Sequence, residues 1–211
     1  APGLLTIPSP NLTTGEGGVG QDYTDEDWLR AIRHGVGKDG RGLFFMPAPA
    51  FQVFSEEDIA ALLAYLKQLP PVDNKLPTRS FELMAKVMTG VGALSPMPVD
   101  LVNHTAPFGA VDIGVTPDYG KILAATCKEC HGEKLNGAPF GPPGQEVITP
   151  NLTPGGELAA WSETDFTITI RTGVTPAGRL LNEEMPWKYY GKMTDDELKA
   201  VWLYLHSLPP L

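Results

Sequence analysis

The sequence has only two cysteines in 211 residues, a shortage of basic residues and no long apolar segment. Its 16 lysines and arginines face 25 aspartates and glutamates, which gives a net charge of −9. So acidic a chain is poorly suited to nucleic acid or to anionic membrane surfaces. No apolar run approaches the roughly 20 residues of a membrane span. We therefore expect no transmembrane segment. The first residues also lack a signal-peptide pattern, which predicts a mature or trimmed chain.

The composition otherwise favours a globular protein rich in loops. Hydrophobic residues make up 42% of the chain, and its length suffices for one large domain or two small ones. The 23 glycines and 21 prolines indicate that turns occupy much of the chain.

Both cysteines lie in the segment ATCKECHGE, where His131 directly follows Cys130 and Cys127 stands three residues earlier. Structural zinc requires four ligands, whereas this segment supplies three at most, and the remaining histidines show no paired spacing. A thioredoxin-like redox pair follows a strand, whereas the upstream segment has the pattern of a helix. Neither alternative suits the surrounding sequence well.

The pattern C-x-x-C-H is also the attachment motif of a covalent c-type haem. Cysteines at i and i+3 lie on the same side of a helical turn, as two vinyl groups on one porphyrin edge require. His131 would then be the proximal iron ligand. The motif is short enough to occur by chance, and a buried thiol pair beside an unrelated histidine is the simplest alternative, so the rest of a haem pocket must be found.

A helix is expected before the motif, with Thr116 as N-cap and Pro117 as its first residue, running through Cys130. A thioether is the sixth ligand that suits electron transfer and raises the reduction potential. Met185 precedes a proline in a loop that Pro186 would stiffen, and it is our candidate. Met193 precedes a helix cap and has the position of a packing residue.

The last helix is expected after Thr194, which forms a capping box with Glu197, and it should end before Pro209. A shorter helix is expected over residues 81–90. Arg171 fits a haem propionate and a solvated helix end equally well. His34 has the pattern of a surface histidine, because the repeat described next places Thr172 at its position.

The chain contains an internal repeat with an offset of 138 to 140 residues. Met46-Pro47 and Met185-Pro186 occupy the same place in the two copies. The paired segments are SPNLTTGEG (9–17) with TPNLTPGGE (149–157), TDEDWLRAIRHGV (24–36) with SETDFTITIRTGV (162–174), and residues 45–72 with residues 184–211.

The first copy lacks a counterpart of the haem motif, because subtracting the offset from Cys127 gives a position before Ala1. Either the given chain is trimmed and the natural protein carries two haems, or the first copy has lost its haem and is structural. Met46 would be the candidate ligand of a second haem, or else a core residue. For the chain as given we expect one covalent haem.

These residues resemble a known family. CKECHG, the Met-Pro loop and the closing aromatic helix are similar to class I cytochromes c. PNLT, IRTGV, EMPW and YLHSLPP resemble the cytochrome c subunits of membrane-bound alcohol and sugar-acid dehydrogenases, and related di-haem cytochromes c. The resemblance implies that Cys127 and Cys130 bind the haem vinyls, with His131 and Met185 as axial ligands. It also implies that a proline carbonyl accepts from the proximal imidazole, for which Pro143 fits, with Pro142 as competitor.

We therefore expect a mainly helical fold with two cytochrome c-like domains in tandem. The expected divisions are an incomplete first domain (1–75), a linker with a short helix (76–115) and a haem c domain (116–211). The expected function is one-electron transfer by a His/Met-ligated haem c in a respiratory chain, outside the cytoplasm. The expected partners are a dehydrogenase, a quinol-oxidising complex or a terminal oxidase.

Two alternatives remain at this stage. The stronger rival to a free carrier is a haem subunit of a larger membrane dehydrogenase or quinol-oxidising complex. A haem peroxidase would need an open or switchable iron, and the Met185 loop argues against one.

Overall fold

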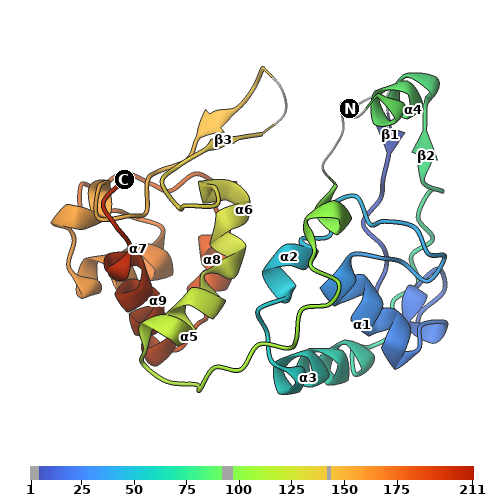
Figure 1. Ribbon diagram of the computed structural model, residues 1–211, viewed down its shortest axis with the longest axis horizontal. Helices are drawn as coiled ribbons and strands as arrows, with labels where there is room; N and C mark the ends of the chain where they lie inside the picture. The colour runs from blue at the N-terminus through green and yellow to red at the C-terminus, as the bar shows by residue number, and fades with distance from the viewer. Residues whose placement is uncertain (1–4, 92–96, 142–143) are drawn as a thin grey trace. The chain divides into compact units, whose positions relative to one another are not determined.

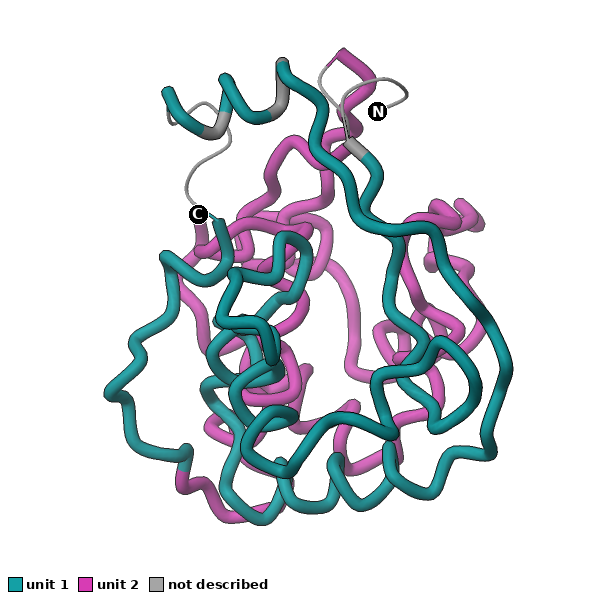
Figure 2. Tube along the Cα trace, turned by 90° about the vertical axis from the view of Figure 1, so that its right-hand side faces the viewer, with its two compact units in different colours: residues 1–109 teal, residues 110–211 magenta. Residues whose placement is uncertain are grey.

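The structure is a computed structural model that describes residues 5–91, 97–141 and 144–211. The chain divides into two compact units, Ala1–Gly109 and Ala110–Leu211 (Figures 1 and 2). Most of the expected linker, residues 76–109, therefore belongs to the first unit. Among the described residues, no helix is long and apolar enough to span a membrane.

The first unit is mainly helical, with one short antiparallel pair in which Leu5 lies opposite Phe81. The expected helix at 81–90 is present and begins at Leu83. The elements of this unit are β1 (Leu5–Thr6), the 3-10 turn η1 (Val19–Gln21), α1 (Asp25–His34), α2 (Ala48–Phe51), α3 (Glu56–Lys67), β2 (Ser80–Phe81), α4 (Leu83–Gly90) and η2 (Pro98–Leu101).

The second unit is also mainly helical, and its β3 and β4 pair antiparallel with Pro139 opposite Ile148. Thr116 caps the first helix by accepting from the Tyr119 amide, as expected. The elements are α5 (Pro117–Leu123), η3 (Ala125–Cys127), α6 (Lys128–His131), β3 (Pro139–Phe140), β4 (Val147–Ile148), η4 (Glu157–Ala160), α7 (Glu163–Thr172), α8 (Trp187–Tyr190) and α9 (Asp195–Ser207).

The expectation of one continuous helix from Pro117 to Cys130 was wrong. The α-helix ends at Leu123, a 3-10 turn follows, and a new helical turn starts at Lys128. Ala124 sits at the break with φ −83° and ψ 2°, and its side chain is 1% exposed. Tertiary packing of this residue overrides the local helical preference, as it often does in short segments.

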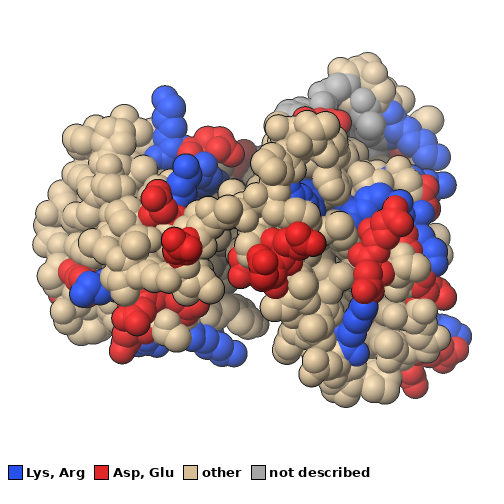
Figure 3. All heavy atoms as spheres, turned by 60° about the horizontal axis from the view of Figure 1, so that its bottom comes forward, with Lys and Arg blue, Asp and Glu red and all other residues tan. Residues whose placement is uncertain are grey.

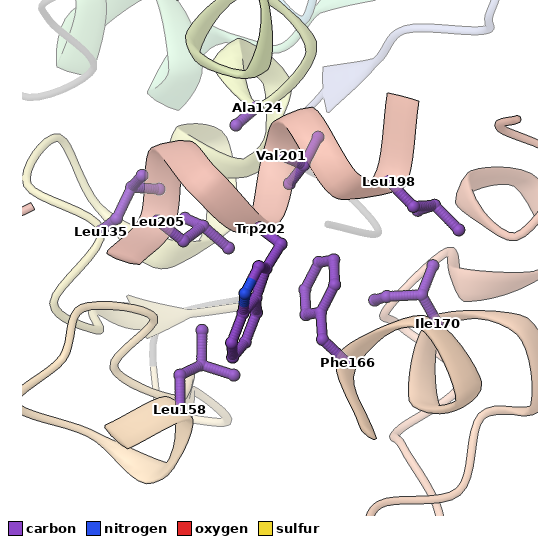
Figure 4. Close-up of a cluster of buried hydrophobic side chains, with 9 residues drawn as sticks. All are labelled: Ala124, Leu135, Leu158, Phe166, Ile170, Leu198, Val201, Trp202 and Leu205. Carbon is purple, nitrogen blue, oxygen red and sulfur yellow. The ribbon is translucent and has the colours of Figure 1, made fainter. Parts of the chain in front are cut away.

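The core of the second unit forms where α5 crosses α9. Gly120 permits the crossing, because a Cβ at this position would lie 1.9 Å from the carbonyl oxygen of Ala200. Trp202 projects from α9 beside Phe166 of α7, with ring centroids 5.6 Å apart (Figure 4). The other members of this buried cluster are Ala124, Leu135, Leu158, Ile170, Leu198, Val201 and Leu205.

The repeated segments adopt matching local structures in the two units. Helices α1 and α7 each begin with a capping box, Thr24 with Asp27 and Ser162 with Asp165. Both end at a glycine in the left-handed conformation, which glycine adopts without the Cβ penalty. Helices α3 and α9 share the same type of cap, and the one at Thr194 is as expected.

The Asn-Leu-Thr turns also make the same long-range contact. The Asn151 amide donates to the Leu211 carbonyl at 2.6 Å, and the Asn11 amide donates to the Val72 carbonyl at 2.7 Å. In each unit, this turn holds the residue that follows the Pro-Pro pair after the last helix of the repeat. The repeat therefore preserves tertiary contacts as well as sequence.

Candidate cofactor-binding site

The Cys-x-x-Cys-His motif occupies the end of η3 and all of α6. Cys127 ends η3, and Cys130 and His131 end the short helix that follows. Both cysteines are free thiols and lie partly buried. The chain then turns sharply at Gly132, whose φ of +81° suits glycine.

His131 is buried, with 6% of its surface exposed. Its Nδ1 lies 2.8 Å from the carbonyl oxygen of Pro150, so this nitrogen donates and Nε2 is available to a metal. Burial lowers the pKa of His131 more than the hydrogen bond to Pro150 raises it, which favours the neutral form that ligates iron.

Pro150 occupies the role that the family resemblance suggested for Pro143. Pro143 and its competitor Pro142 lie outside the described residues. The signal that points to Pro150 is the repeated Pro-Asn-Leu-Thr segment, whose turn is anchored in both units. Sequence spacing alone could not show that this turn reaches back to the motif.

Thr149 ties the same turn to the motif by a second contact. Its hydroxyl lies 2.9 Å from the carbonyl oxygen of Cys130, and it accepts from the Ala138 amide at 2.9 Å. The Gly137 amide donates to the His131 carbonyl at 3.0 Å. These bonds hold the end of α6 against the 149–150 backbone, so the imidazole orientation is set by more than one contact.

A cavity of about 330 Å³ opens beside the motif. Cys127, Cys130 and His131 line it, together with both candidate thioethers, Met185 and Met193. The remaining lining is largely apolar and includes Leu123, Phe140, Leu152, Leu158, Trp161, Phe166, Ile170, Leu181, Leu198, Val201 and Leu205.

The two methionines differ in how their backbone is held. The Met185 amide donates to the Asn182 carbonyl at 3.0 Å, in the loop before α8. The Met193 carbonyl accepts from Arg171 at 3.0 Å, directly before the cap of α9. Both side chains are half-buried and pack on the core of the second unit, so burial does not distinguish them.

Arg171 does not line the cavity. Its guanidinium donates to the carbonyl oxygens of Gly191 and Met193, at 2.6 and 3.0 Å, and pairs with Asp195 at 2.7 Å. Arg171 is exposed in the last turn of α7, as the helix-end alternative expected. It fixes the segment between the Met185 loop and α9.

The aromatic residues after Met185 have separate roles. The Tyr190 hydroxyl lies 3.0 Å from the Thr126 hydroxyl, and the Tyr190 side chain lines the cavity. Trp187 packs against Gly173, where an added Cβ would lie 2.5 Å from the indole. Tyr189 is 73% exposed. The Thr126–Tyr190 bond joins the motif segment to the methionine loop, and no sequence pattern indicated it.

The apolar surroundings raise the pKa of the Cys127 thiol to about 12, chiefly by burial and secondarily by the neighbouring Cys130. Burial also raises the pKa of Cys130. Thiolates, which zinc binding and disulfide exchange require, are disfavoured here. A neutral thioether would suit this environment. The described residues contain no group of three or more His, Cys, Asp or Glu side chains placed for a metal ion.

The family model for cytochrome c matches residues 118–209, which include the motif, the cavity and α9. The second unit contains a cytochrome c domain. Cytochrome c domains carry haem and serve electron transport. The Cys-x-x-Cys-His motif and the apolar cavity of this chain fit a haem group.

Three relatives extend the similarity over nearly the whole chain. The cytochrome c subunit of the quinone alcohol dehydrogenase of Gluconacetobacter polyoxogenes is 32% identical over 98% of this chain and 48% of its own length. The fructose dehydrogenase cytochrome subunit of Gluconobacter japonicus is 27% identical over 96% and 45%. A diheme cytochrome c-type protein of Cereibacter sphaeroides is 25% identical over 99% and 73%.

This chain spans about half the length of the first two relatives. The similarity covers the first unit as well as the second, so it extends beyond the residues that the family model matches. Met46 of the first unit is half-buried and packs on a cluster that includes Trp28 and Ile32.

Proposed function

We propose that this chain holds one haem c through thioether bonds to Cys127 and Cys130 and passes single electrons between redox proteins. The observation that carries the proposal is one apolar cavity lined by both cysteines, by His131 and by Met185. When bound, haem c supplies an iron that gains and loses one electron.

The protein's own residues set the conditions for that chemistry. His131 offers Nε2 because Pro150 occupies Nδ1. Met185 offers a neutral sulfur from a loop between Asn182 and α8, and a thioether ligand favours the reduced state. The largely apolar lining limits the access of solvent to a bound group, which helps to set its redox potential.

We further propose that the electron donor or acceptor is a dehydrogenase, outside the cytoplasm. Support comes from the names of the relatives, two of which are cytochrome subunits of an alcohol and a fructose dehydrogenase. Within such an assembly the chain is an electron-transfer subunit and does not itself transform the substrate.

A second candidate is a two-haem protein in which the first unit also binds haem. Met46 precedes Pro47 as Met185 precedes Pro186, and these prolines have similar backbone angles, ψ 54° and 47°. Ala200 is fully buried where the leading helix α5 crosses α9. Its repeat counterpart in the first unit, Ala61 of α3, is exposed. The first unit therefore resembles a cytochrome c domain without its leading helix, and the diheme relative supports this view.

Production of the chain in a host with cytochrome c maturation tests both candidates. Intact mass and a pyridine haemochrome count should give one haem per 22.7 kDa chain. Replacement of both cysteines by serine should give a colourless protein. A colourless wild-type chain would overturn the proposal. Two haems on a longer natural chain would favour the second candidate.

A further inference from the structure

The first unit brings together two histidines that are 70 residues apart in the chain. Nδ1 of His34 lies 3.2 Å from Nδ1 of His104, and the rings are stacked with centroids 5.3 Å apart. His34 ends α1 and is half-buried, whereas His104 is exposed in the segment after η2. The repeat does not require His34, because Thr172 occupies its place in the second unit.

The loop that carries His104 is anchored on both sides. Before it, Asn103 exchanges two hydrogen bonds with the Gln52 amide, at 2.7 and 3.0 Å. After it, the Arg33 guanidinium donates to the carbonyls of Ala106 and Pro107, at 2.6 and 2.5 Å. Arg33 is 2% exposed, so the anchor is part of the core. The histidine pair is therefore held by the fold.

We propose that His34 and His104 form a two-histidine site for a divalent transition-metal ion. Two metal–nitrogen bonds of about 2.1 Å that meet at roughly 90° to 109° hold their nitrogens about 3.0 to 3.4 Å apart. The observed separation of 3.2 Å lies within that range. Water molecules would complete the coordination, and the ligand order favours Cu²⁺ over Zn²⁺.

The contact between the two rings is compatible with metal binding. Burial lowers the pKa of His34, with smaller contributions from His104 and Arg33, which favours the neutral form of this ring. The Nδ1 contact requires one donor and one acceptor. On metal binding, the donor's proton moves to its Nε2, so no net proton is lost.

A Cu²⁺ titration of the haem-loaded protein, kept oxidised, tests the site by calorimetry and electron paramagnetic resonance. We expect one bound equivalent with two nitrogen ligands, and a loss of affinity of at least tenfold in either His34→Ala or His104→Ala. His206→Ala is the matched control, because His206 lies in the last turn of α9 with its ring tilted against Trp202, at a centroid distance of 3.7 Å. The copper affinity of His206→Ala should equal that of the wild-type protein.

Equal copper affinity in all four proteins would place the ion elsewhere and overturn the site, and so would a loss in only one of the pair variants. His34→Gln, with the circular dichroism of each variant, separates loss of the ligand from loss of the fold. If no haem attaches, the same titration is made after alkylation of the thiols. The metal site is therefore tested separately from the proposed function.

Discussion

At the scale of single residues, the site depends on which atom each side chain offers. His131 presents Nε2 because Pro150 takes Nδ1, and Thr149 holds the adjacent backbone. The sequence predicted His131 from the motif itself. It could not identify Pro150, because a carbonyl acceptor depends on where a distant turn lies in the fold.

The two methionines of the cavity provide a residue-scale prediction. Met185→Leu should remove the thioether ligand, lower the reduction potential and abolish the weak long-wavelength band of an iron–sulfur(Met) bond. Met193→Leu is the matched control, because Met193 lines the same cavity. Optical spectra and a redox titration measure both effects. An unchanged spectrum in Met185→Leu, or a changed ligand in Met193→Leu, would contradict the assignment.

At the scale of elements, caps and close helix contacts determine the frame of the site. The capping box at Thr194 and the N-cap at Thr116 follow from local sequence and are present. The break at Ala124 and the partners of Arg171 do not follow from it, because they depend on packing between elements far apart in the chain.

Because α5 and α9 cross closely, one methyl group added at Gly120 should lower the free energy of unfolding by a large amount. Gly120→Ala would place a Cβ 1.9 Å from the Ala200 carbonyl, so the helices must separate. We expect a loss of about 3 kcal/mol or more in the free energy of unfolding, measured by denaturant titration. Gly114→Ala, with no atom near the added Cβ, should change it by less than about 0.5 kcal/mol. Similar values for the two variants would contradict a close crossing.

The cap of α7 predicts how stability depends on pH. The backbone and hydroxyl of Ser162 lower the pKa of Asp165 from its ordinary value. The ionised carboxylate therefore stabilises the fold above the ordinary pKa of about 4, and this contribution is lost as the pH falls through the lowered pKa.

Ser162→Ala should raise the pKa of Asp165 toward its ordinary value and cost about 1 kcal/mol of stability at neutral pH. Carboxyl NMR titration and thermal unfolding measure the two effects. Thr194→Ala in α9 is the control, because it removes a cap of the same type while leaving Asp165 in place. The amide of residue 162 still donates to Asp165 in Ser162→Ala, so an Asp165 midpoint that stays fixed would contradict a contribution from the hydroxyl.

At the scale of the whole molecule, the chain consists of two compact units with repeated elements, and only the second contains the attachment motif. In the view of Figure 3, acidic and basic side chains are interspersed, without one large basic area. The repeat was visible in the sequence, whereas the inclusion of residues 76–109 in the first unit was not. Hydrogen bonds such as that from the Gly109 amide to the Phe54 carbonyl explain that inclusion.

The division into units predicts which helices lose protection from hydrogen exchange when the cofactor is absent. Without haem, amide protection should fall in α5, α7 and α9 and stay unchanged in α1 and α3, because the cavity lies within the second unit. Hydrogen exchange of the haem-loaded and haem-free chains measures this difference. Equal loss of protection in both units would show that they fold as one.

The short turn at residues 149–153 also has a mechanical consequence. The Asn151 side chain donates to the Leu211 carbonyl, and the carbonyl of the adjacent Pro150 accepts from the His131 imidazole. A load applied at Leu211 would therefore reach the backbone one peptide away from the contact of His131, the proposed iron ligand. Pulling on Leu211 in a single-molecule experiment should therefore alter the redox response before α9 unravels.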